Sequence, residues 1–96
     1  MYILVTYDVQ TETPAGQRRL RQVARLCMNY GQRVQNSVFE CVLTEVQLAE
    51  LKHKLEVVMD LESDSIRIYY LNRSEHRRIV TIGKNNSVDV ERSLII

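Results

Sequence analysis

The chain opens with an almost uninterrupted apolar run, Met1 to Tyr7, that ends at a single aspartate, Asp8. The run is rich in β-branched and aromatic residues, which predicts a strand over residues 2–8. Because the run is apolar at nearly every position, we expect both faces of the strand to be covered and the strand to lie inside a sheet. A chain of 96 residues has room for only one domain, so this strand belongs to its single core.

The rest of the chain alternates between helical and strand patterns. Pro14 marks the start of a helix, and Gly31 is placed to close it. Between them, four apolar residues follow the spacing of a buried helical face: Leu20, Val23, Ala24 and Cys27. Residues 33–43 are strand-like with a break at 36–37, which predicts two short strands or one bent strand. Thr44 and Gln47 form a capping box that starts a second helix, and residues 65–71 alternate like a strand.

This β-α-β-β-α-β order predicts an α+β fold of the ferredoxin-like type. Residues 79–83 add a further short strand, and the chain ends in an apolar tail that frays unless something covers it. We therefore predict a ferredoxin-like domain over residues 1–83, including the extra strand, and a tail over residues 84–96 packed on a dimer partner. The additional C-terminal strand is predicted to be exchanged across a homodimer.

The charge of the chain is distributed unevenly, although its net value is only +1. Residues 15–36 contain five arginines and no acidic residue: Arg18, Arg19, Arg21, Arg25 and Arg33. On a helix, Arg18, Arg21 and Arg25 fall within about 60° of one another, opposite the apolar face. Such a row is either a solvated helix face or a phosphate-binding surface. A guanidinium can fork two hydrogen bonds to one phosphate, and no acid is placed to neutralise the row.

Asp8 is the carboxylate best placed for chemistry, at the mouth of the predicted central strand. An aspartate in that position can simply form the following turn. It can also bind Mg²⁺ or Mn²⁺, because such ions commonly take one or two carboxylates and complete their shell with water and phosphate oxygens. One aspartate per chain supplies few protein ligands for a metal ion. Two copies that meet across a dimer axis would make a shared site.

Other patterns give weaker signals. His53 and His76 lack metal-ligand spacing, and the sequence around Gly83 and Lys84 lacks the frame of a phosphate-binding P-loop. Asp60, Glu62 and Asp64 form an acidic segment that is either a solvated loop or a chelator of a hard cation. Cys27 and Cys41 are predicted to be buried free thiols, which suits a cytoplasmic protein. The opening run is too short to span a membrane, and no membrane partner is expected.

Several segments together resemble the small universal adaptation protein of CRISPR systems. They are the opening strand ending in Tyr7-Asp8, the arginines of the first helix, residues 30–40 (YGQRVQNSVFE) and residues 64–69 (DSIRIY). The resemblance implies a ferredoxin-like homodimer and a metal-dependent endonuclease acting on RNA or double-stranded DNA. It implies that Asp8 binds the metal and that Tyr7, Arg18, Arg19, Arg33 and Phe39 correspond to site residues of the family. Phe39 is either a substrate contact or part of the core.

Three functions follow as expectations. The first is a magnesium-dependent endonuclease in spacer acquisition for antiviral defence, with Asp8 and Tyr7 as catalytic residues. The second is a non-catalytic scaffold that holds DNA on its arginines and bridges CRISPR integrase subunits. In both cases we expect backbone contacts without base readout. The third is a small-molecule regulatory domain, since this fold alone does not determine function.

Overall fold

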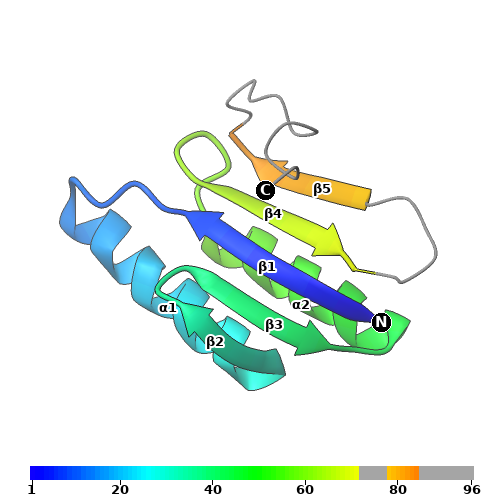
Figure 1. The fold of residues 1–96 in the computed structure, drawn as a ribbon. Coiled ribbons are helices and arrows are strands. Elements are labelled where there is room, and N and C mark those ends of the chain that lie inside the picture. Colours follow the sequence, from blue (N-terminus) through cyan, green and yellow to red (C-terminus); the bar gives the residue numbers. More distant parts are fainter. Residues whose placement is uncertain (72–77, 85–96) are drawn as a thin grey trace.

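In the computed structural model, five antiparallel strands form one sheet, and two helices cover one of its faces (Figure 1). The structure describes residues 1–71 and 78–84. The elements along the chain are β1 (Tyr2–Asp8), α1 (Pro14–Tyr30), β2 (Gly31–Gln35), β3 (Val38–Val42), α2 (Glu45–Val58), β4 (Ser65–Tyr70) and β5 (Arg78–Gly83).

The sheet order is β2-β3-β1-β4-β5, so β1 lies at the centre, as its apolar sequence predicts. β1 pairs with β3 on one side and with β4 on the other. The β-α-β-β-α-β order and the α+β class predicted from the sequence are confirmed. Residues 33–43 contribute to two strands, and the pairing of β2 with β3 shifts register between Arg33 and Gln35.

The additional strand predicted over residues 79–83 is present as β5. β5 pairs antiparallel with β4 of the same chain, from Ser65 opposite Gly83 to Tyr70 opposite Arg78. Within the single chain, β5 therefore forms the edge of the sheet next to β4. The physical reason is proximity, because β5 directly follows β4 and antiparallel neighbours can be joined by a short connection. Exchange across a dimer stays a prediction, and the tail over 85–96 lies outside the described residues.

The two faces of the sheet have different environments. Ile3, Val5 and Tyr7 of β1 point towards the helices and are buried, while Leu4 and Thr6 lie on the opposite face and are partly exposed. The core beneath the helices includes the predicted residues Val23, Ala24 and Cys27 of α1. From α2 it includes Leu48, Leu51 and Leu55. Alternation along β1 thus places Asp8 on the face without helices.

Both helix starts and the end of α1 agree with the sequence. Thr13 caps α1 with Pro14 at its first position, and the Thr44–Gln47 capping box of α2 is complete. Gly31 directly follows the last residue of α1, as predicted, and its N–H donates to the Cys27 carbonyl, but its φ of −164° is extended backbone that any residue adopts. A glycine is needed there because a Cβ would collide with the Glu40 carbonyl and the Cys41 sulfur of β3.

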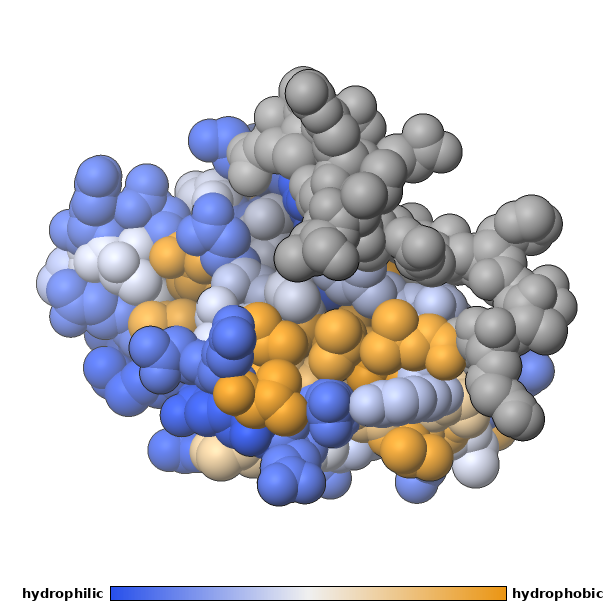
Figure 2. Space-filling model, in the orientation of Figure 1, coloured by the Kyte–Doolittle hydropathy of each residue, from blue (hydrophilic) through white to orange (hydrophobic). Residues whose placement is uncertain are grey.

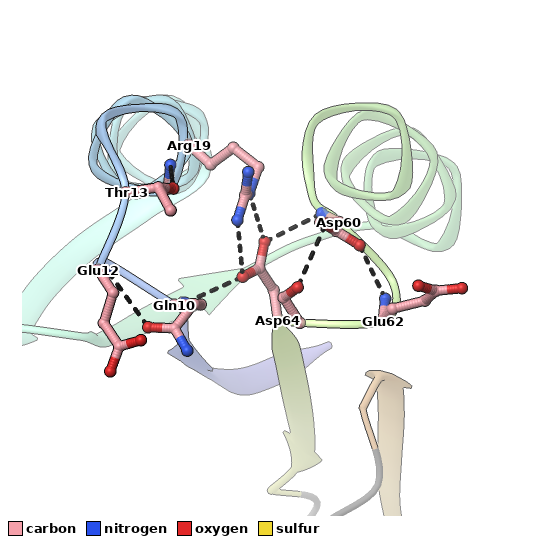
Figure 3. A network of polar contacts seen from close by, with 9 residues as sticks. Gln10, Glu12, Thr13, Arg19, Asp60, Glu62 and Asp64 are labelled. Carbon is pink, nitrogen blue, oxygen red and sulfur yellow. Dashed lines mark hydrogen bonds and ion pairs between the residues drawn. The ribbon is translucent and has the colours of Figure 1, made fainter.

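A buried carboxylate, Asp64, joins the segments that surround the end of β1 (Figure 3). Its Oδ1 accepts a hydrogen bond from the backbone N–H of Gln10 at 3.0 Å, and its Oδ2 accepts one from Asp60 at 2.9 Å. Arg19 of α1 donates through Nε to Oδ2 at 2.8 Å and through Nη2 to Oδ1 at 3.5 Å. In the acidic segment predicted as a solvated loop or a cation chelator, Asp60 and Glu62 are exposed, as in a solvated loop. Asp64 is the exception, because it is buried in an ion pair with Arg19.

Opposing effects act on the pKa of Asp64. Burial raises the pKa, whereas the hydrogen bonds from Arg19 and from the backbone of Asp60 and Gln10 lower it, and the net pKa is below the ordinary value of 3.8. A depressed folded-state pKa stabilises the fold at pH values above the unfolded-state pKa. That contribution is lost as the pH falls through the folded-state pKa.

We predict that Asp64→Asn destabilises the fold by about 2–4 kcal/mol at pH 7, because an amide nitrogen would face buried donors and Arg19 would lose its partner. Below pH 4 the difference from wild type should shrink, since the wild-type carboxylate becomes protonated. Urea unfolding at pH 7 and pH 3 measures both effects. Glu56→Gln, which alters an exposed carboxylate of α2, is the control and should change stability by less than about 0.5 kcal/mol. Equal unfolding midpoints for Asp64→Asn and wild type at pH 7 would contradict the assigned role.

Candidate functional site

Asp8 lies at the end of the central strand with its side chain exposed. It stands directly opposite Ser65 of β4 in the sheet register. Within the described residues, the Asp8 side chain has no hydrogen-bond or ion-pair partner. An exposed carboxylate without an internal partner is free to bind a cation or a substrate.

A polar depression of about 260 Å³ surrounds Asp8. Its lining comes from the ends of β1, β4 and β5 and the loops next to them: Asp8, Val9, Gln10, Thr11, Ser63, Ser65 and Lys84. The three hydroxyl residues and Lys84 were not predicted as site residues. Strand pairing places Ser65 opposite Asp8, although the two are more than fifty residues apart in sequence. Gly83, which precedes Lys84, lies opposite Ser65 on the next strand.

Tyr7 and Phe39 form a packed pair on the helix side of the sheet. Their ring centroids are 6.0 Å apart, Phe39 is fully buried, and the Tyr7 hydroxyl donates to the Asn36 carbonyl at 3.2 Å. Burial raises the pKa of Tyr7, while a hydrogen bond with Arg33 acts to lower it. The structure thus does not bring Tyr7 into the depression with Asp8, although the two are adjacent in sequence, because neighbouring strand residues point to opposite faces.

Arg33 lies next to the pair formed by Tyr7 and Phe39. Its Cζ lies 5.2 Å from the centroid of the Phe39 ring, a cation–π arrangement on the helix side. The guanidinium therefore lies with Tyr7 and Phe39 and not with Asp8. Of the two interpretations of Phe39, the structure supports the core.

The arginines of α1 divide into two groups. Arg18, Arg21 and Arg25 are exposed, and none has an ion-pair partner within the described part of the chain. Arg19 is different, because its side chain is only 18% exposed and its guanidinium is paired with Asp64. We call Arg18, Arg21 and Arg25 the arginine row. α1 begins at the end of the sheet where β1 finishes, so the row starts at the same end of the molecule as Asp8 (Figure 1).

The residues around Asp8 are suited to a divalent cation only as a minimal site. Across residues 1–71 and 78–84, no group of three or more His, Cys, Asp or Glu side chains is placed to hold a metal. A magnesium ion accepts one or two carboxylates, with water and substrate phosphate as its other ligands. Asp8 therefore fits such an ion if a second carboxylate or a substrate completes the shell.

The sheet face that carries Asp8 is apolar away from the site. Figure 2 shows hydrophobic residues gathered over β1 and β3 on the side opposite the helices. Tyr2 pairs with Val42 in the register, and these side chains are 42% and 77% exposed. Leu4 and Val38 on the same face are partly buried. We call Tyr2, Leu4, Val38 and Val42 the open-face patch.

Two further predictions concern the chain as a whole. Cys27 and Cys41 are buried free thiols, as predicted, and burial raises the pKa of Cys27 to about 12. A thiol with that pKa stays protonated and unreactive at neutral pH. Among the helices in the described ranges, none is both long and apolar enough to cross a membrane.

Comparisons with known proteins agree on one family. The family model for CRISPR associated protein Cas2 matches residues 1–79. The chain is 50% identical to CRISPR-associated endoribonuclease Cas2 1 of Moorella thermoacetica, with all of both chains covered. It is also 50% identical to CRISPR-associated endonuclease Cas2 of Halalkalibacterium halodurans, with 99% of both chains covered.

Solved structures give the same result. The crystal structure of Streptococcus pyogenes Cas2 matches with a TM-score of 0.72 and 58% sequence identity, covering 77% of this chain and 89% of that one. A hypothetical protein from Thermus thermophilus matches with a TM-score of 0.67 and 32% identity, covering 88% and 94%. With a family model that matches residues 1–79 and a relative 50% identical over the full length of both chains, the chain belongs to the CRISPR-associated Cas2 family.

Proposed function

We propose that this protein is a CRISPR-associated, metal-dependent endonuclease that hydrolyses phosphodiester bonds of double-stranded DNA, RNA or both during spacer acquisition in the cytoplasm. The observation that carries the proposal is the exposed Asp8 carboxylate, unpaired within the described residues, in a polar depression of a Cas2-family chain. Relatives that match over their full length are named endonucleases or endoribonucleases. The proposal assigns that type of activity to this chain and to this depression.

Asp8 is the residue that would hold Mg²⁺ or Mn²⁺. When bound, such an ion polarises a scissile phosphate and lowers the pKa of an attacking water. The side chains around Asp8 bind and orient the phosphodiester, because hydroxyl groups of Thr11 and Ser65 can donate to its oxygens. Tyr7 and Phe39 act indirectly by packing beneath β1 and holding the strand that presents Asp8.

Removing the charge of Asp8 tests the proposed nuclease function. Asp8→Asn keeps the size of the side chain but removes the charge that binds the cation, so cleavage should fall by roughly a hundredfold or more. Glu12→Gln, at an exposed acid in the loop after β1, should cleave at the wild-type rate. Labelled duplex DNA and RNA are incubated with each variant in Mg²⁺ and in chelator. Equal cleavage by wild type and Asp8→Asn would show that the activity comes from a contaminant.

We propose that two copies associate through the open-face patch to form a homodimer. Val42 and Tyr2 leave apolar surface exposed on the same sheet face as Asp8. Burial of apolar surface contributes about 25 cal/mol per Å², so a second copy on this face would be stabilised. Association there would bring together two faces that each carry one Asp8, which supplies the second carboxylate that the chain itself lacks near the site.

A charge within the patch should therefore separate the copies. Val42→Asp is expected to give a monomer by light scattering coupled to size-exclusion chromatography, because a carboxylate would be desolvated at the contact. Val57→Asp is the matched control, since Val57 is 71% exposed on α2, away from the sheet face. It should keep the wild-type mass. If both variants keep that mass, the contact lies elsewhere on the molecule.

A second candidate function is supported by the arginine row. Three exposed guanidinium groups, without an ion-pair partner in the ranges that the structure describes, can contact phosphates of a duplex whether or not the chain cleaves it. In this function the protein is a DNA-binding scaffold that bridges CRISPR integrase subunits. The contacts would be to the backbone, which carries no direct sequence information.

The row makes a prediction of its own. Arg18→Ala combined with Arg21→Ala should weaken binding to duplexes of different sequence equally, and should reduce the slope of log affinity against log salt by roughly one per lost phosphate contact. Lys52→Ala combined with Lys54→Ala removes the same charge from α2 and should leave the slope unchanged. Fluorescence anisotropy at several salt concentrations provides both values. An unchanged slope in the arginine variant would place the DNA on another surface.

A further inference from the structure

We propose that Lys84 is a phosphate-binding residue of the Asp8 site, a role that rests on the nuclease function proposed above. Lys84 follows β5 directly and lines the same polar depression as Asp8, Thr11 and Ser65. The sequence around it does not match a P-loop. Its assignment depends only on where the sheet places it.

The position of Lys84 is determined by strand register and by one glycine. Asp8 is opposite Ser65, and Ser65 is opposite Gly83, so these residues form a row across β1, β4 and β5. Gly83 has a φ of +99°, which side-chain-bearing residues rarely adopt, and a Cβ there would collide with the Asp64 carbonyl. The chain then turns so that the Lys84 N–H donates to that carbonyl at 2.7 Å.

The position of Lys84 would be the same whether β5 comes from the same chain or from a dimer partner. The β4–β5 register and the bond to the Asp64 carbonyl are backbone features. A β5 strand exchanged in a dimer with the same register would bring a lysine to the same depression. The proposal therefore does not depend on whether β5 is exchanged.

The Lys84 side chain is available for a ligand. It is exposed and, within the described residues, has no hydrogen-bond or ion-pair partner. Arg19 illustrates the contrast, since its guanidinium is already paired with Asp64. In the depression Lys84 contributes one positive charge and Asp8 one negative charge. With a divalent cation the depression carries a surplus of positive charge, and this surplus attracts a phosphodiester anion.

Cleavage kinetics are the first test. Lys84→Ala should lower kcat/KM by roughly tenfold to a hundredfold, because the loss of one hydrogen bond to a charged group changes an equilibrium by about that factor. Lys84→Arg keeps the charge and should recover part of the rate, while Lys52→Ala, with its lysine on α2, should match wild type. Melting temperatures show whether each variant is folded. Wild-type kcat/KM in Lys84→Ala would overturn the proposal.

A binding measurement separates this proposal from the nuclease function. Inorganic phosphate is titrated into ¹⁵N-labelled Asp8→Asn and into Asp8→Asn combined with Lys84→Ala, without metal and without cleavage. In the first protein, the amide signals of Thr11, Ser63 and Ser65 should shift, and the dissociation constant should rise roughly tenfold in the second. Equal dissociation constants, or no shift at these amides in Asp8→Asn, would overturn the role of Lys84. Absence of cleavage by wild type would instead refute the nuclease function, and the titration would still report on Lys84.

Discussion

The arrangement around the end of β1 depends on the buried carboxylate of Asp64. A charge removed from water is costly unless hydrogen bonds and an opposite charge compensate it. Asp64 receives such bonds from the segment after β1, from the segment after α2 and from α1 through Arg19. Its own carbonyl accepts the bond from Lys84. One residue thus connects two loops, a helix and the end of β5, and so defines the surface on which Asp8 is exposed.

The alternation of β1 then assigns different roles to adjacent residues. Tyr7 packs with Phe39 under the helices, whereas Asp8 lies on the open face near Ser65. A shift of register by one residue would exchange these environments and bury the carboxylate. The apolar pairing of β1 with β3 and β4 resists such a shift, because it would also expose Ile3 and Val5 to water.

Local patterns were enough to predict most of the fold. The capping box at Thr44, the proline after Thr13 and the apolar spacing of α1 report interactions within a few residues, and the structure confirms them. Asp8 could be singled out because it directly ends the central strand. Gly31 was correctly placed at the end of α1. The reason that a glycine is needed there is its contact with β3, and the sequence near the helix end contains no sign of that contact.

The roles of Asp64, Arg19 and Lys84 could not be predicted for the same reason. Asp64 appeared as one of several acids in a polar segment, and only its contact with Arg19, 45 residues away, distinguishes it from Asp60 or Glu62. Arg19 likewise resembled its neighbours on α1 until the structure showed which side of the helix meets the buried acid. Lys84 needed two successive strand pairings to reach Asp8. Such long-range coincidences follow from the assembled sheet and not from any local pattern.

The two proposed functions place different demands on the same chain. A scaffold needs the arginine row and a stable pair of copies, and neither requires a carboxylate at the end of β1. A nuclease also needs Asp8 together with groups that hold a phosphate against it. The polar depression supplies such groups from β4 and from the segments next to β1, β4 and β5, beside an aspartate that has no internal role within the described residues. A carboxylate that neither caps a turn nor pairs with an arginine contributes little to the fold, and this favours hydrolysis over a purely structural function.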